Sequence, residues 1–382
     1  MATRIDPNVQ FIREMQAAGG ESLKKCYQCA TCSVICPLSP DDTPFPRKEM
    51  VWAQWGQKEK LVNDIDIWLC HNCGECSDLC PRGAKPGDLL AALRNMAYKS
   101  MARPAALGTW MSSAKYLPIL FAIPAVLFLI VWAITTGLTI PDGEIVFSKV
   151  FPTLQAIDPI FILTVVFVVF TFVYSVGRML SSFREVGPVP DENSPSLLRA
   201  LGGVIKDEIL THTKFKDCES NKDRYTGHLL IFYSFIALFI VTAFVATAYW
   251  ADKFGIIEFA TPMALWNPIK ILANVGGIAL IIGLVLVTRN RLNADPQKTV
   301  NSFYDWYLIG VIWAVTITGF LAQIFRVADA AALAYIVYYL HLVTVFMLFA
   351  YLPWSKLAHL VYRTFALAYA RQVGRTTTPV RE

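Results

Sequence analysis

The stretch CYQCATCSVICP, residues 26–37, is followed by a second stretch of the same design, CHNCGECSDLCP, at residues 70–81. Each has three cysteines separated by two residues, and then a fourth cysteine before a proline. Where two such runs occur together, three thiolates of each run bind one [4Fe-4S] cluster and the fourth reaches across to the other. We therefore predict two [4Fe-4S] clusters with crossed ligands. The first cysteine set is Cys26, Cys29, Cys32 and Cys80, and the second cysteine set is Cys70, Cys73, Cys76 and Cys36.

Zinc and disulfide bonds are the alternatives for these cysteines. A structural zinc site closes one tetrahedron with pairs of ligands, whereas each run here offers three evenly spaced cysteines and a fourth. Disulfide bonds need an oxidising compartment. Residues 1–10 are polar and lack the apolar stretch of a signal peptide. We therefore expect the cysteines to face a reducing cytoplasm.

The composition indicates a membrane protein with a soluble head. Hydrophobic residues make up 55% of the 382-residue chain, charged residues only 16%, and the mean hydropathy is +0.45. This balance lies outside the range of an ordinary soluble domain. The net charge of +5 is small, and the excess basic residues lie between hydrophobic segments. That distribution favours control of membrane topology and argues against a nucleic-acid partner.

Residues 1–104 have the pattern of a small helical domain around the two cysteine runs. Helices are predicted at residues 7–18, 47–55 and 87–100. The segment lacks the alternating pattern of strands. We therefore predict an all-α protein whose head is an α-helical, ferredoxin-like domain and not a β-rich one. Residues 105–115 are the expected linker into the membrane.

Six stretches are long and apolar enough to cross a bilayer. They are residues 116–140, 159–180, 227–250, 268–287, 306–325 and 332–353. Because hydrocarbon offers no water to unpaired backbone groups, such runs are expected to be helical. We predict a six-helix transmembrane cytochrome b bundle over residues 116–364, followed by a tail over residues 365–382.

Lysine and arginine gather in alternate connections between these stretches. Residues 178–224, 289–298 and 356–381 are rich in both, whereas the other connections carry only Lys149, Lys253 and Arg326. Basic loops stay on the cytoplasmic side. With six spans, the head and the C-terminus are both expected on the cytoplasmic side of the inner membrane.

Histidine is rare, and four of the five histidines gather near the third and sixth predicted spans. These four are His212, His228, His341 and His359. Two neutral imidazoles that face each other across antiparallel helices can hold a b-type haem. His228 begins the third span and His359 closes an extension of the sixth, so both fall at the cytoplasmic boundary. Arg224 and Arg363 are close in sequence to His228 and His359, respectively, and are available to pair with haem propionates.

Two pairings of these histidines remain open. His341 lies near mid-membrane, where an ionisable group is a candidate functional residue. The 16-residue separation of His212 and His228 is close to the 18-residue separation of His341 and His359. His228 could therefore pair with His341, and His212 with His359. The fifth histidine, His71, lies inside the second cysteine run, where we expect a surface or cluster-shielding role.

The cysteine runs and two of the apolar segments resemble those of known protein families. The two cysteine runs resemble the C subunit of heterodisulfide reductase. Residues 225–250 and 339–360, the latter reading YLHLVTVFMLFAYLPWSKLAHL, resemble membrane cytochrome b subunits of the nitrate reductase gamma and heterodisulfide reductase E types. Their fusion in one chain is similar to the C subunits of the quinone-interacting membrane-bound oxidoreductase (Qmo) complexes. The resemblance covers nearly the whole chain.

The resemblance implies a subunit of a quinone-linked oxidoreductase complex that is not catalytic alone. Its implied cofactors are two [4Fe-4S] clusters, two b-type haems and menaquinone. Its implied partners are the flavin and iron–sulfur subunits Qmo A and Qmo B, with adenylylsulfate reductase of dissimilatory sulfate reduction beyond them. An alternative is the equivalent subunit of a heterodisulfide reductase-like or sulfite-reducing membrane complex. His228, His341 and His359 match three of the family's four haem-ligand positions, Leu238 occupies the fourth, and His212 is the remaining candidate.

Two other classes of membrane protein fit the sequence less well. A transporter would need acidic or paired charges inside its spans, whereas the predicted spans carry only Arg178 and Lys270, near their ends. A passive anchor leaves the four histidines unexplained. Neither a dinucleotide fingerprint nor a nucleophile elbow occurs, so any chemistry is expected to be shared with partner subunits.

The predicted topology can be tested with reporter fusions at Asp142 and Glu382. The basic connections place the first position outside the cytoplasm and the second inside it. Reporters active only on one side of the membrane should therefore give opposite signals at the two positions. Equal signals would mean that a span has been miscounted.

Overall fold

The structure is a computed structural model that describes residues 6–213, 215, 222–259, 261–295 and 300–375. Residues 1–5 of the predicted head and residues 376–382 of the predicted tail lie outside the described residues. Parts of two predicted basic connections, residues 216–221 and 296–299, also lie outside them. The described residues contain helices and no strand. The prediction of an all-α protein is therefore confirmed.

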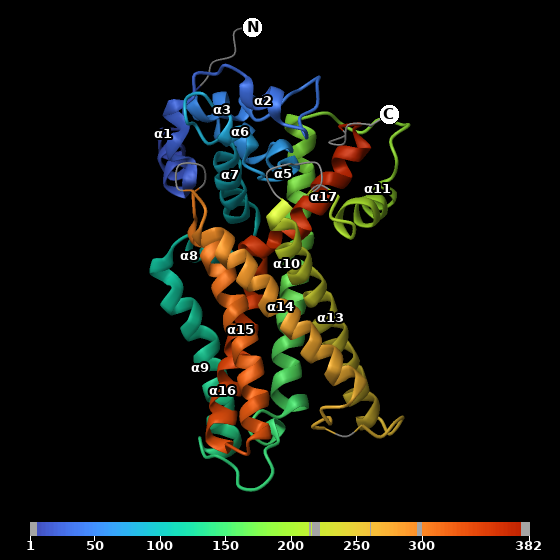
Figure 1. Cartoon of the computed structure of the whole chain (residues 1–382). Helices are drawn as coiled ribbons and strands as arrows, with labels where there is room; N and C mark the ends of the chain where they lie inside the picture. The colour runs from blue at the N-terminus through green and yellow to red at the C-terminus, as the bar shows by residue number, and fades with distance from the viewer. Residues whose placement is uncertain (1–5, 214, 216–221, 260, 296–299, 376–382) are drawn as a thin grey trace.

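The head is a compact group of short helices around the two cysteine runs (Figure 1). Its helices are α1 (Val9–Met15), α2 (Thr31–Ile35), α3 (Arg47–Gln54), α4 (Lys58–Val62), α5 (Asp66–Leu69), α6 (Glu75–Asp78) and α7 (Pro86–Met101). Helix α7 begins at a proline, which suits the first turn because its missing N–H would be unpaired there. The predicted linker is itself partly helical, as α8 (Ala105–Trp110).

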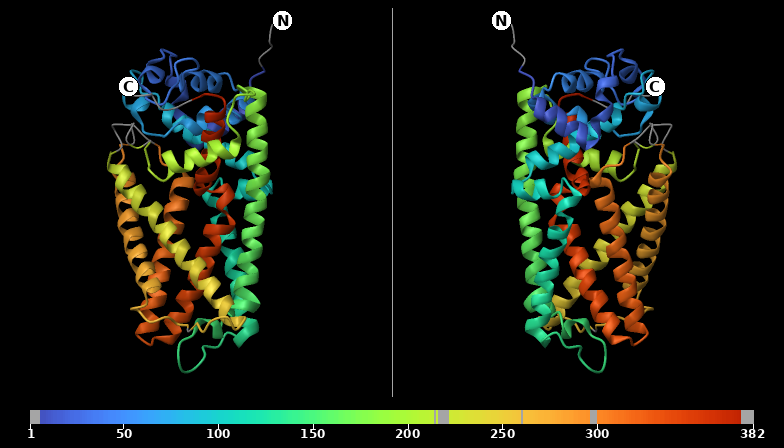
Figure 2. Two further views of the ribbon diagram at one scale, coloured as in Figure 1. Left: turned by 90° about the vertical axis from the view of Figure 1, so that its right-hand side faces the viewer. Right: turned by 90° about the vertical axis from the view of Figure 1, so that its left-hand side faces the viewer.

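Within the described residues, six long apolar helices form the bundle, as predicted. They are α9 (Leu117–Thr136), α10 (Asp158–Val186), α13 (Lys222–Lys253), α14 (Pro268–Leu292), α15 (Phe303–Val327) and α16 (Ala331–Ala350). The connections α9–α10, α13–α14 and α15–α16 lie at the end of the bundle away from the head (Figure 2). The amphipathic segment before α13 includes α11 (Leu197–Val204), which packs against the last helix of the chain.

The sixth span does not extend to His359, so that prediction is wrong. Helix α16 ends at Ala350, and two short 3-10 turns separate it from α17 (His359–Gln372). Pro353 explains the break, because proline lacks a backbone N–H and disfavours helical geometry in the residue before it. His359 is instead the first residue of α17. Helix α17 continues to Gln372, beyond residue 364, where we predicted the end of the membrane domain.

Helix α17 joins the bundle to the head (Figure 1). The ring of Tyr362 lies 5.5 Å from that of Trp68 and 5.7 Å from that of Tyr98, both in the head. All three side chains are fully or almost fully buried. Burial of large aromatic side chains gives strong apolar stabilisation, so this contact fixes the head against α17.

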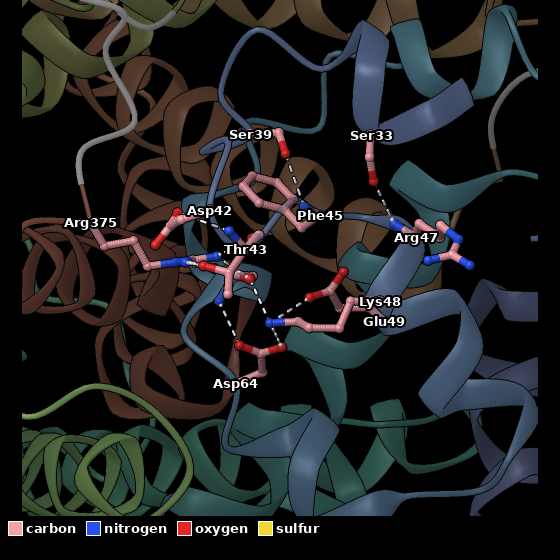
Figure 3. Close-up of polar contacts among 11 residues, drawn as sticks. Ser33, Ser39, Asp42, Thr43, Phe45, Arg47, Lys48, Glu49, Asp64 and Arg375 are labelled. Atoms are coloured by element: carbon pink, nitrogen blue, oxygen red, sulfur yellow. Dashed lines mark hydrogen bonds and ion pairs between the residues drawn. The ribbon is translucent and has the colours of Figure 1, made fainter. Parts of the chain in front are cut away.

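Beyond α17, Arg375 enters a buried charge cluster in the head (Figure 3). Its Nε and Nη2 donate to the Asp66 carboxylate at 2.8 and 2.7 Å. Asp66, Asp64 and Glu49 have oxygens within 4.8 Å of one another. Lys48 Nζ lies 2.7 to 3.2 Å from all three carboxylates. Because a buried carboxylate needs a nearby cation, Arg375 and Lys48 compensate the charge of this cluster, and Arg375 thereby holds the segment after α17 on the head.

Helices α13 and α14 approach each other closely at two glycines. A Cβ built on Gly283 would lie 2.9 Å from Cγ1 of Ile231 and 3.0 Å from the carbonyl oxygen of Gly227. Small residues allow such close packing in membranes. By contrast, a Cβ on Gly310 of α15 would meet no atom within 4 Å.

Replacement of Gly283 by leucine should therefore destabilise the bundle. Overpacking of a tight contact costs about 1–3 kcal/mol, because α14 would have to move away from α13. Gly310→Leu is the matched control, since that position is exposed in an apolar helix. Thermal unfolding in detergent should show a lower Tm for Gly283→Leu than for Gly310→Leu. Equal Tm values would contradict the close contact.

Candidate redox centre

Both cysteine runs fold into the same tight turn. In each run, the second and fourth residues after the first cysteine have positive φ angles, between 56° and 96°; these residues are Gln28, Ala30, Asn72 and Gly74. The backbone N–H of Gln28 donates to Sγ of Cys26 at 3.4 Å, and that of Asn72 to Sγ of Cys70 at 3.3 Å. The left-handed residues turn the chain sharply, which allows the cysteines of one run to line one cavity.

The fourth cysteines cross between the two runs. One cavity is lined by the first cysteine set, Cys26, Cys29, Cys32 and Cys80. A second cavity is lined by the second cysteine set, Cys36, Cys70, Cys73 and Cys76. The structure thus brings together the members of each predicted set. Their binding of iron stays a prediction.

The chemistry of these cavities fits a bound iron–sulfur cluster. Burial raises the pKa of the Cys32 thiol to about 11 and that of Cys36 to about 12. A thiolate at these positions therefore needs a cation beside it, which cluster iron would supply. Gly87 also lines the second cavity, where a Cβ would lie 3.7 Å from Sγ of Cys76.

The first cysteine set lies at the surface of the head. Cys29 is exposed. The apolar side chains beside this set, Tyr27, Val34 and Leu79, are 68%, 85% and 57% exposed. Arg82 lies over the ring of Tyr27 at 4.1 Å. The first set is therefore the more exposed of the two.

The second cysteine set lies beside the bundle, held by arginines from three helices. Arg94 of α7 donates to the carbonyl of Cys70 at 3.0 Å. Arg224 of α13 donates to the carbonyl of Asn72 at 3.0 Å, and Arg363 of α17 to that of Trp68 at 3.1 Å. Arg224 and Arg363, which we expected at haem propionates, thus contact the head.

His71 has a more central place than the sequence suggested. Its Nδ1 lies 3.2 Å from Nη1 of Arg363, and its ring meets Phe215 edge-on at 4.3 Å. Burial and the charge of Arg363 lower the pKa of His71 well below its usual value. The residue therefore sits between the second cysteine set and α17. Its position next to Cys70 was the only sequence signal for this role.

Three of the predicted histidines gather where α13 meets α17. Nε2 of His212 lies 3.1 Å from Nδ1 of His228. The rings of His228 and His359 have centroids 6.4 Å apart and planes inclined by 67°. Two imidazoles that share one metal ion have centroids about 6 Å apart, given metal–nitrogen bonds of ~2 Å. His228 and His359 are therefore spaced so that both could bind one metal ion, and they would be the residues that hold a haem iron.

The hydrogen bonds of these two histidines also fit that role. Nδ1 of His359 donates to the carbonyl of Lys356 at 2.7 Å, and Nδ1 of His228 is engaged by His212. Among the described residues, neither Nε2 atom has a hydrogen-bond partner. Burial lowers the pKa of His359 to about 4, so its ring is neutral. Metal-binding histidines commonly use one nitrogen for the metal and the other for a hydrogen bond.

His341 lies apart from the other histidines. Its Nδ1 is 3.1 Å from both the carbonyl of Val315 and Oγ1 of Thr318, on α15. Gly319 makes room for its ring, since a Cβ there would lie 3.1 Å from Cε1. All five histidines are described, and none of the others has a ring contact with His341. The structure therefore brings together neither His228 with His341 nor His212 with His359.

Comparisons with known proteins divide the chain in the same way. Residues 22–84 match the family described as 4Fe-4S dicluster domain. Residues 117–379 match the family described as citrate utilization protein B. No solved structure matches the chain.

Curated relatives resemble either the head or the bundle. The C subunit of the H(2):CoB-CoM heterodisulfide,ferredoxin reductase of Methanothermobacter marburgensis is 37% identical over 92 residues, which are 24% of this chain and 49% of the relative. The E subunit of the dihydromethanophenazine:CoB--CoM heterodisulfide reductase of Methanosarcina barkeri is 29% identical over 156 residues, 38% of this chain and 57% of the relative. The chain thus spans about half the length of these relatives.

These findings agree with the fold and with the grouping of the cysteines. The head is a two-cluster iron–sulfur domain similar to the C subunit of heterodisulfide reductase, and part of the chain is similar to the E subunit. The match over residues 117–379 covers more than half of the chain. The chain therefore belongs to the citrate utilization protein B family, with a 4Fe-4S dicluster domain at its head.

Proposed function

We propose that this chain carries electrons between menaquinol, a b-type haem held by His228 and His359, and the two clusters of its head. One observation carries the proposal: His359 and Arg363 lie on the same helix, and Arg363 contacts His71 of the second cysteine loop (residues 70–80) and Trp68 just before it. Four residues of an α-helix rise by about 6 Å. The candidate haem ligand and the second cysteine set are therefore close neighbours.

The bound cofactors would supply the electron chemistry, since haem and [4Fe-4S] clusters are one-electron carriers. The chain's own residues set their surroundings. Arg94, Arg224 and Arg363 bring three positive charges to the second cysteine loop. Positive charge and hydrogen-bond donors next to a cluster favour its reduced state. The arginines thus support the second cysteine set as the electron acceptor on the membrane side.

The first cysteine set is the proposed exit toward a soluble partner. Its exposed Cys29 and the apolar side chains around it, Tyr27, Val34 and Leu79, support a docking face for a protein with its own redox cofactor. The order would then be quinol, haem, second cysteine set, first cysteine set and partner. A second haem at His341 is not included, because no other histidine faces that side chain.

Two complexes are candidates for this subunit. The fusion of head and membrane domain supports a Qmo-like complex, with Qmo A and Qmo B as flavoprotein partners and adenylylsulfate reductase as the electron acceptor. The curated relatives favour a heterodisulfide reductase-like complex. Purification from native membranes, followed by identification of the bound subunits, distinguishes the two.

Single replacements of the histidines test the haem site. His228→Ala and His359→Ala should each abolish the b-type α band in reduced-minus-oxidised spectra, because each removes one axial ligand. His341→Ala is the control and should keep the band, since its Nδ1 bonds α15. Loss of the band in His341→Ala but not in His359→Ala would contradict the assignment.

Cysteine replacements test the crossed ligand sets. The purified protein should contain about eight cluster irons, four for each cluster. Cys80→Ser should damage the cluster of the first cysteine set, and Cys36→Ser that of the second, as measured by electron paramagnetic resonance of the reduced protein. Stoichiometric zinc, or the reverse pattern of damage, would show that the assignment is wrong.

A further inference from the structure

We propose that His212 is a positioning residue: it holds the Nδ1 side of His228 and thereby presents the Nε2 of His228 to the haem iron. This inference rests on the proposed function. It assigns to His212 a role different from that of an axial ligand. The role depends on three features of His212: its hydrogen bond, its burial and its backbone conformation.

The ring of His212 is fixed against His228. The two ring nitrogens are 3.1 Å apart, and the ring planes are inclined by 61°. Phe232 meets the His212 ring edge-on at 4.9 Å. The hydroxyl of Tyr233 donates to the carbonyl of Leu210 at 2.7 Å, which holds the backbone just before His212. These contacts leave the imidazole little freedom to turn toward another partner.

The hydrogen bond determines which nitrogen of His228 is available. A neutral imidazole has one nitrogen that donates and one that accepts. If Nδ1 of His228 donates to Nε2 of His212, then Nε2 of His228 carries no proton and is free to bind a metal. An acceptor on Nδ1–H also makes the opposite nitrogen a stronger ligand. With His212 as the acceptor, His212 would set both the tautomer and the ligand strength of His228.

His212 has two unfavourable features that ordinary packing would not require. It is only 5% exposed, yet its Nδ1 has no hydrogen-bond partner among the described residues. Its φ angle is 53°, in the left-handed region, which is uncommon for residues other than glycine, although histidine adopts it more often than most. Features of this kind persist where the surrounding structure holds a residue for a function. Their combination in the residue that contacts His228 supports the positioning role.

The same geometry argues against His212 as an iron ligand. Its Nε2 is already engaged by His228, and its Nδ1 is buried. The ring that lies at metal-sharing distance from His359 is that of His228. Among the described residues, His212 has no ring contact with His359.

Replacements of His212 in the full chain test the proposal. His212→Leu should keep the b-type band, weaken haem binding by about 10–100-fold, as is typical for the loss of such a hydrogen-bond partner, and raise the haem reduction potential. His212→Gln offers an amide oxygen as acceptor and should restore both properties toward the wild type. Phe215→Leu is the packing control, since Phe215 contacts both rings without a side-chain hydrogen bond, and it should leave the potential unchanged.

A second measurement does not depend on haem. Nitrogen-15 resonances of the five histidines in the haem-depleted full chain should show His228 protonated at Nδ1, and His212→Leu should change this to a mixture of tautomers. The proposal is overturned if His212→Leu abolishes the haem band as His228→Ala does, or if it changes neither the potential nor the tautomer. A wild-type protein without haem would refute the proposed function, while the tautomer would still decide whether His212 sets His228.

Discussion

The contact between α17 and the second cysteine loop is the constraint on which the rest of the arrangement depends. Arg363 donates to the carbonyl of Trp68 and lies beside His71. The pairing of Arg375 with Asp66 is a second contact between the segment after α17 and the head. Because α17 begins at His359, any displacement of the head would also disturb the proposed haem site.

The result is a fixed order of chemical groups from the membrane to the solvent. His228 and His359 lie where α13 and α17 meet. Arginine side chains of the same two helices contact the segment that carries the second cysteine set. The first cysteine set is farther out, with Cys29 exposed. A one-electron path needs such an order, because each carrier must lie near the next one. Both cysteine runs have the same turn, so their surroundings and not their backbone distinguish them.

The sequence predicted the features that depend on local spacing. The cysteine sets follow from a repeated twelve-residue pattern, and the six spans follow from length and hydropathy. The position of His359 was missed because Pro353 ends the preceding helix, and a continuous apolar run conceals such a break. The roles of His71 and Arg363 were missed because they are 292 residues apart. The contact of His212 with His228 likewise depends on tertiary folding.

The central claim is that electrons reach the head only through the histidine pair. Its most direct test is the time course of cluster reduction after a menaquinol analogue is mixed with the full chain in lipid nanodiscs. In the wild type, the haem band should appear before the cluster signals. In His359→Ala, both clusters should stay oxidised with the quinol but be reduced by dithionite. Reduction of the clusters by quinol at the wild-type rate in His359→Ala would contradict the account.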